Sequence, residues 1–150
     1  DVYKRQAEGM VAHGIGTSRT RKLQVEQLLQ DVGLEASMAD RYPHQFSGGQ
    51  RQRICIARAL ALEPKVLLAD EATAALDVLI QKQILELLLS LRKKYNLALI
   101  FISHDLRLVS QLCDRVIVMQ NGKIAENAPT KQLFTAPKAD YTQFLLRNIP

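Results

Sequence analysis

The chain has 150 residues, of which 47% are hydrophobic and 23% are charged, and its formal net charge is +5. These are the proportions of an ordinary globular protein that can bury a real core. The longest strongly apolar run, 97–102, is far too short for a membrane-spanning helix. A basic chain permits a polyanionic partner, but only 5% of the residues are aromatic, which argues against a nucleic-acid binder.

The first six residues, DVYKRQ, show neither apolar periodicity nor a helix cap, and we interpret residues 1–6 as a non-native leader. Helical spacing of apolar residues then predicts a helix from Thr20 to a C-cap near Gly33. Ser47 is a favoured N-cap residue, and it precedes a second predicted helix, 50–62. Cys55 in that helix is predicted to pack as a small apolar residue.

Two short apolar runs are predicted to be buried strands, 66–69 and 97–102. A strongly amphipathic helix, 77–95, connects them. A short helix at 106–113, a hairpin turning at 121–122, and two short helices near the C-terminus follow. This alternation predicts an α/β fold with a parallel sheet.

Acidic and polar residues follow both predicted strands. Asp70 and Glu71 end the first strand, and His104 comes shortly after the second. Parallel sheets place ligands beyond the carboxyl ends of their strands, so we expect these three side chains to lie close together. An aspartate there can hold Mg²⁺ through water, and the following glutamate can polarise an attacking water. The alternative is a pair of acids that cap the next turn, with a structural histidine nearby.

The stretch SGGQ, at 47–50, gives a second candidate site. Two glycines at a helix N-terminus let backbone N–H groups approach an anion closely. Alone, the stretch is better explained as an ordinary N-cap with a glycine turn.

Taken together, the motifs have a specific order and spacing. They are YPHQFSGGQRQR, ADEATAALDV, IFISHDL and APKADYTQFLL, which begin at residues 42, 69, 100 and 136. This series resembles the ATP-binding subunit of ABC transporters, and most closely the peptide/nickel importer branch. The resemblance implies the C-terminal part of a P-loop NTPase (RecA-like) core with a mostly parallel sheet, plus the helical subdomain of this family. It also implies ATP and Mg²⁺ as cofactors.

The resemblance implies a role for each matching residue. Ser47, Gly48, Gly49 and Gln50 would form the signature that meets the γ-phosphate of ATP held by a second ATPase subunit. Asp70 would support Mg²⁺, and Glu71 would be the general base. Asp77 would belong to the D-loop, which touches the partner subunit. His104 would contact the γ-phosphate. Positioning and charge stabilisation carry most of the catalysis in phosphoryl transfer, which fits this division.

The chain departs from the family pattern in three places. Ala72 stands where the family usually has proline, and Ala74 stands where it has serine. The phosphate loop G-x-x-x-x-G-K-[ST] is not found in the sequence, since the nearest approach, 9–14, is followed by Ile15 and Gly16. We therefore expect an N-terminally truncated subunit that is inactive alone. Its expected segments are the leader 1–6, the helical subdomain 7–62, the second half of the ATPase core 63–128, and the start of a C-terminal extension 129–150.

The implied function is ATP hydrolysis that energises import of short peptides or nickel and its chelates. The implied partners are a second ATPase subunit, a membrane permease and, indirectly, a solute-binding protein, at the cytoplasmic face of the membrane. No nucleic acid is expected. An ABC-type ATPase acting on nucleic acid or ribosomes is the alternative, although the zinc cysteines of some such proteins are not found here.

Overall fold

The computed structural model describes residues 1–73 and 76–148, and its contacts divide the chain into two compact units. The first unit is Asp1–Ile100 and the second is Phe101–Pro150. The division does not coincide with the segment boundaries expected at 62/63 and 128/129. Those segments are defined by roles within a family, so they stay a prediction.

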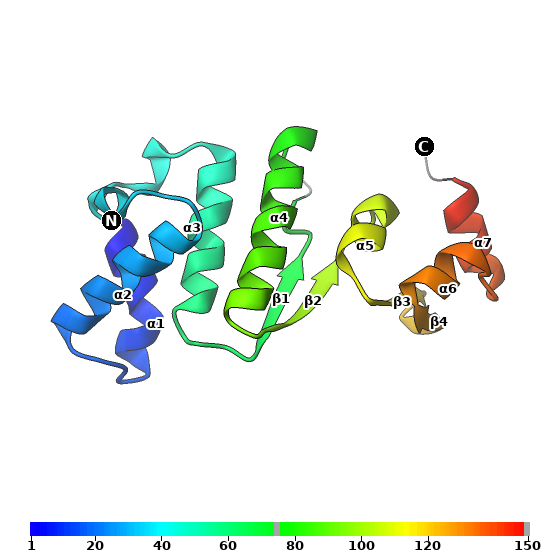
Figure 1. The fold of residues 1–150 in the computed structure, drawn as a ribbon, viewed down its shortest axis with the longest axis horizontal. Helices are drawn as coiled ribbons and strands as arrows, with labels where there is room; N and C mark the ends of the chain where they lie inside the picture. Colours follow the sequence, from blue (N-terminus) through cyan, green and yellow to red (C-terminus); the bar gives the residue numbers. More distant parts are fainter. Residues whose placement is uncertain (74–75, 149–150) are drawn as a thin grey trace. The chain divides into compact units, whose positions relative to one another are not determined.

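The first unit opens with a group of helices that pack on one another (Figure 1). In chain order they are α1 (Val2–Ala12), α2 (Ser18–Asp31), the 3₁₀ turns η1 (Ala36–Asp40) and η2 (Pro43–Gln45), and α3 (Gly48–Leu60). Their shared core contains the buried side chains of Ala7, Met10, Val25, Leu28, Leu29, Ile56, Ala57 and Leu60. The helix expected from Thr20 begins earlier, because Thr17 and Thr20 form a capping box there.

The expectation of an uncapped leader at residues 1–6 is wrong in its structural part. The Asp1 carboxylate accepts a hydrogen bond from the Lys4 backbone N–H at 2.7 Å and caps α1. Val2 and Gln6 are buried, and Gln6 Nε2 donates to the Ile54 carbonyl of α3 at 2.7 Å. The spacing of apolar residues did not reveal this turn, because one of its two buried residues, Gln6, is polar.

The rest of the first unit is a strand–helix–strand segment, β1 (Val66–Asp70), α4 (Val78–Lys94) and the start of β2 (Ala98–Ile102), whose last two residues fall in the second unit. The two strands pair in one sheet, and Figure 1 shows them side by side and pointing in the same direction. Asp77 caps α4 through the Ile80 N–H at 3.0 Å. The apolar row of α4 is buried as expected, at Ile84, Leu85, Leu87, Leu88 and Leu91.

Both strands were expected to be buried, but β1 is buried on one face only and β2 is at most half-buried. In β1, Leu67 and Ala69 are buried, whereas Leu68 on the opposite face is 60% exposed. In β2, Ile100 is 52% exposed. A crossover helix covers one face of a parallel pair, so strands with apolar side chains on both faces leave the other face bare.

Asp31 ties the end of α2 to the end of α4. Its carboxylate accepts hydrogen bonds from Lys94 Nζ at 2.5 Å, from Gln27 Nε2 at 2.9 Å, and from the Tyr95 hydroxyl. Burial would raise the pKa of Asp31, but these donors outweigh burial and hold the pKa below its ordinary value. Burial, with Asp31 beside it, raises the pKa of Tyr95. The contact fixes the helical group against the strand–helix–strand segment.

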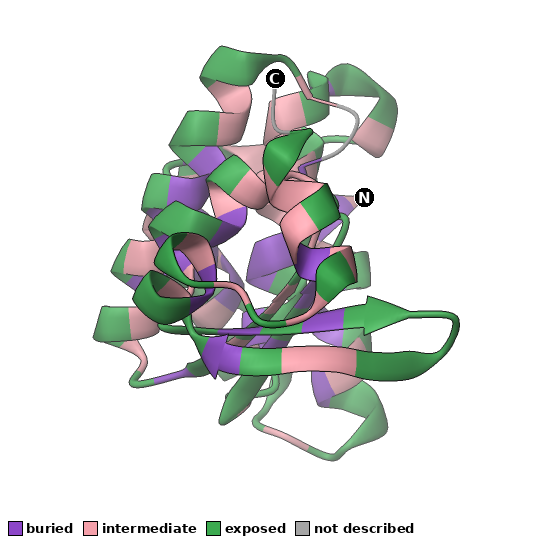
Figure 2. Ribbon diagram, turned by 90° about the vertical axis from the view of Figure 1, so that its right-hand side faces the viewer, coloured by how far each residue is buried: buried purple, intermediate pink, exposed green. Residues whose placement is uncertain are grey.

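The second unit contains α5 (Leu106–Leu112), β3 (Arg115–Gln120), β4 (Lys123–Pro129), α6 (Thr130–Thr135) and α7 (Asp140–Arg147). The strands form the expected antiparallel hairpin. Asn121 and Gly122 both have positive φ, +50° and +74°, as a type I′ turn requires. Figure 2 shows buried stretches alternating with exposed ones along the hairpin. Its buried side packs with the flanking helices in a cluster of Val109, Val116, Val118, Ala128 and Leu133.

Three smaller features complete the description of the fold. Cys55 is exposed, so its predicted packing role is wrong; Cys113 is half-buried. Of the basic residues on α3, Arg53 donates to the Val32 carbonyl at 2.7 Å and Arg58 pairs with Glu8 at 3.0 Å. Among the described residues, no helix is both long and apolar enough to cross a membrane.

Candidate functional site

The N-terminus of α3 is built by a capping box between Ser47 and Gln50. The Gln50 N–H donates to Ser47 Oγ at 3.3 Å, and the Ser47 N–H donates to Gln50 Oε1 at 3.0 Å. Each side chain therefore accepts a bond from the other residue's backbone. Within residues 1–73 and 76–148, neither the Ser47 O–H nor the Gln50 NH₂ donates to a protein acceptor, so both remain available to a ligand.

The two glycines between them complete an anion-binding geometry. In the described part of the chain, neither the Gly48 N–H nor the Gly49 N–H has a hydrogen-bond acceptor. Free N–H groups at a helix N-terminus, with the positive end of the helix dipole behind them, favour a phosphate or carboxylate group. The first turn of α3 thus offers backbone N–H groups and two side-chain donors to one anion.

Asp70 and Glu71 stand where β1 ends, as the sequence predicts, and both are exposed. Glu71 has φ +49°, a left-handed conformation that costs a non-glycine residue about 1–2 kcal/mol. Residues held in such conformations cluster at functional sites. The described residues contain no ready-made group of three or more His, Cys, Asp or Glu ligands for a metal.

The loop after the acids is anchored to the first turns of α4. The Thr73 carbonyl accepts a hydrogen bond from Gln81 Nε2 at 3.0 Å and another from the Leu76 N–H at 3.2 Å. Thr73 is itself buried. Ala72, one of the departures from the family pattern, is half-buried beside it, and Ala74, the other, lies outside the described residues.

Asp77 and His104 occupy different surroundings. Asp77 is exposed and caps α4, which gives this expected D-loop residue a structural role as well. β2, the neighbour of β1, ends at Ile102, two residues before His104. His104 belongs to the second compact unit, so its expected closeness to Asp70 and Glu71 stays a prediction.

The loop that follows β2 also has its own fixed geometry. The Asp105 carboxylate caps α5 through the Arg107 N–H at 2.9 Å. The Arg107 guanidinium also pairs with it at 3.2 Å. These bonds from Arg107 hold the pKa of Asp105 below its ordinary value. His104 therefore lies immediately before the capped helix α5, and Glu71 lies immediately before the anchored loop.

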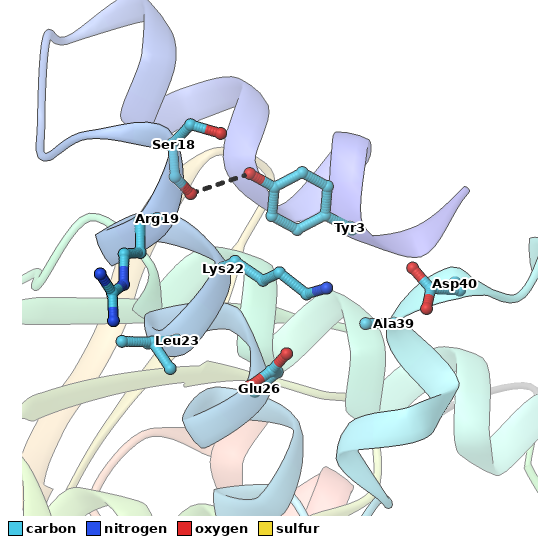
Figure 3. Close-up of a pocket in the computed structure, with 8 residues that line it drawn as sticks. All are labelled: Tyr3, Ser18, Arg19, Lys22, Leu23, Glu26, Ala39 and Asp40. Atoms are coloured by element: carbon cyan, nitrogen blue, oxygen red, sulfur yellow. Dashed lines mark hydrogen bonds between the residues drawn. The ribbon is translucent and has the colours of Figure 1, made fainter.

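The nearest approach to a phosphate loop, residues 9–14, is not a loop. Its first four residues belong to α1, and His13 is the C-cap of that helix. A surface pocket does exist between α1, α2 and η1, where the Lys22 side chain extends between Tyr3 and Glu26 (Figure 3). None of the predicted site residues lines this pocket.

Three residues that hold this site show no signal in the sequence. Thr73 and Gln81 form the anchor of the acidic loop, and Ile80 packs against Gly49. A buried threonine and an ordinary helical glutamine or isoleucine show no pattern that a single sequence can reveal.

Similarity to known proteins agrees with the predicted family. Residues 3–74 match the family model described as ABC transporter. The chain is 50% identical over 143 residues to the glutathione import ATP-binding protein GsiA of Escherichia coli K12, and 48% identical to GsiA of Pectobacterium atrosepticum. Each match covers 95% of this chain, which spans 23% of the length of these relatives.

Two solved structures share the fold. The structure of cbiO1 from Clostridium perfringens, part of the ABC transporter complex cbiONQ, has a TM-score of 0.80 and 32% identity, and the match covers 91% of this chain and 53% of that one. A metal-chelate type ABC transporter in an inward-facing conformation has a TM-score of 0.84 and 28% identity, covering 99% and 58%. The predicted fold class, part of an ABC-type P-loop NTPase, is confirmed.

Proposed function

Because the chain belongs to the ABC transporter family of ATP-binding proteins, we propose that it supplies the signature and the catalytic acids of an ATPase that energises import through a membrane permease. The observation that carries the proposal is the first turn of α3. There Gly48 and Gly49 keep free N–H groups, while Ser47 and Gln50 hold each other in place. This is the donor set that a terminal phosphate requires.

In the proposed mechanism, ATP lies between two ATPase subunits. The first turn of α3 of one subunit donates to the γ-phosphate of ATP held by the other, and Asp77 lies at the same junction. Donors already oriented by a capping box need little rearrangement when charge develops on the phosphate. Bound ATP therefore completes the contact between the subunits.

The acids after β1 fit Mg²⁺ and a water nucleophile. Mg²⁺ keeps most of its water shell and takes only one or two protein carboxylates, so the single exposed Asp70 suffices. Bound Mg²⁺ would neutralise charge on the phosphates. Glu71, in its left-handed conformation two residues before the anchored Thr73, accepts a proton from the attacking water, and His104 contacts the γ-phosphate.

The cargo we propose is a short peptide, because glutathione is a tripeptide and the GsiA proteins carry glutathione import in their names. Nickel or its chelates remain the second cargo class of this branch. The partners are a second ATPase subunit, permease subunits and, through them, a solute-binding protein. The subunit would then sit on the cytoplasmic face of the membrane without crossing it.

The test uses the natural full-length subunit that carries this sequence, assembled with its permease, and the substitution Glu71→Gln. Loss of the general base should lower kcat for ATP hydrolysis about 100-fold or more while ATP still binds. Glu63→Gln is the matched control, because Glu63 is also exposed and also has φ +49°.

Comparing the two variants separates loss of the general base from the effect of replacing any glutamate in a left-handed conformation. If hydrolysis by Glu71→Gln continues at the parent rate, Glu71 is not the base. If Glu63→Gln loses as much activity as Glu71→Gln, the loss reflects general damage, and the assignment fails as well.

A further inference from the structure

The two glycines of SGGQ meet the neighbouring helix differently. A Cβ placed on Gly48 would lie 3.6 Å from Cδ2 of Leu76, which is an ordinary contact. A Cβ placed on Gly49 would lie 2.8 Å from Cγ2 of Ile80, closer than two such carbons approach. Two adjacent residues of one motif therefore have opposite steric situations.

Ile80 is poorly able to move out of the way. Its χ1 angle is restricted because it is β-branched and lies in the first turn of α4. Its backbone is fixed as well, since its N–H donates to the Asp77 carboxylate at 3.0 Å. A larger side chain at residue 49 would have to displace α3 itself.

We propose that Ile80 is a positioning residue that seats the N-terminus of α3, and that residue 49 is glycine because of this contact rather than because of the bound phosphate. The steric part of the proposal stands on the geometry alone. Its consequence for ATP hydrolysis rests on the proposed function.

The same turn of α4 also holds the acidic loop. Gln81, the next residue along the chain, donates to the Thr73 carbonyl at 3.0 Å, two residues after Glu71. Ile80 and Gln81 thus fix the signature and the loop of the general base to one helical turn.

The test is a double-mutant cycle in the natural full-length subunit without nucleotide. Gly49→Ala should lower the midpoint of thermal unfolding, Tm, by about 5 °C, since an inserted methyl overpacks the contact. In the Ile80→Ala background the same substitution should leave Tm unchanged or raise it, because Cγ2 is gone and alanine favours helix more than glycine. Gly48→Ala is the matched steric control, and it should not lower Tm.

A second measurement asks whether the contact positions the signature. Gly49→Ala should lower kcat/KM for ATP hydrolysis about tenfold, because a small displacement of phosphate donors is costly. Adding Ile80→Ala should recover most of that loss relative to Ile80→Ala alone. If the contact has only a structural role, Ile80→Ala should restore Tm in the Gly49→Ala variant without restoring kcat/KM.

Two outcomes would overturn the proposal. One is a Gly49→Ala subunit as stable as its parent, or equally destabilised with and without Ile80. The other is a double variant that regains Tm but not ATP hydrolysis, which would mean that the nucleotide requires the glycine. A parent subunit with no ATPase activity at all would refute the proposed function instead, and the Tm cycle would still decide the steric contact.

Discussion

The chain enters α3 and α7 in two different ways. Just before α7, whose N-cap Ala139 makes no side-chain hydrogen bond, the Glu126 carboxylate on β4 accepts hydrogen bonds from the Lys138 and Ala139 N–H groups, each at 3.0 Å. At α3 the N–H groups of Gly48 and Gly49 have no such partner in the described chain. An internal carboxylate holds the chain that leads into α7, and Asp140 lies in the first turn of α7, whereas the first turn of α3 has no acidic residue and favours an external anion.

The largest expected effect comes from making α3 resemble α7. Gly48→Asp would place a carboxylate in the open turn, where the contact with Leu76 leaves ordinary room for a side chain. A negative charge about 5 Å from a phosphate costs about 3 kcal/mol at an effective dielectric of 20, so the proposed ATP-driven pairing of subunits should weaken roughly 100-fold. Sedimentation with Mg-ATP measures the pairing, and Gly48→Asn is the uncharged control. Equal loss in both variants would show that charge is not what matters there.

A smaller effect is expected when α3 loses its own cap. Ser47→Ala removes the acceptor for the Gln50 N–H, which typically costs about 1 kcal/mol of folding stability. Denaturant unfolding of the full-length subunit measures it. The comparison with α7 would be weakened if Ser47→Ala were neutral for stability, since the first turn of α3 would then not depend on its capping box.

The smallest effect is expected at α7, where the carboxylate is accessible to solvent. The Ala139 and Lys138 N–H groups hold the pKa of Glu126 below its ordinary value of 4.5. Its stabilising contribution is therefore complete above that value and is lost as pH falls through the lower pKa of the folded state. Glu126→Gln should speed amide exchange in α7 at pH 7, and the difference from the parent should shrink below pH 4.5. A difference that persists at low pH would exclude the charge as its cause.

Local signals in the sequence predicted most of the helices and the hairpin. Ser47 and Asn121-Gly122 were identified from cap and turn chemistry, which depends only on neighbouring residues. Burial of the strands was overestimated at Leu68 and Ile100, because burial depends on what covers a sheet face and not on the strand itself. The cap at Asp1 was missed because the turn after it contributes few apolar residues to the core.

The residues of the candidate site were easier to find than the contacts that hold them. Asp70, Glu71 and SGGQ stand out because charge or glycine at the edge of an apolar element is unusual. The packing of Ile80 on Gly49 joins residues 31 positions apart, and periodicity along one helix contains no information about its neighbour. Distances between elements are set by the fold, so only the structure shows them.

The bare face of the β1–β2 sheet has a consequence for the life of the protein in a cell. Val66, Leu68, Ile100 and Ile102 are each about half exposed or more, and they stand on adjacent strands. Apolar strands in this state can stack or pair with other chains, and they are also what chaperones and proteases recognise. Without another segment or a partner over it, this face would therefore limit how long the protein survives in a cell.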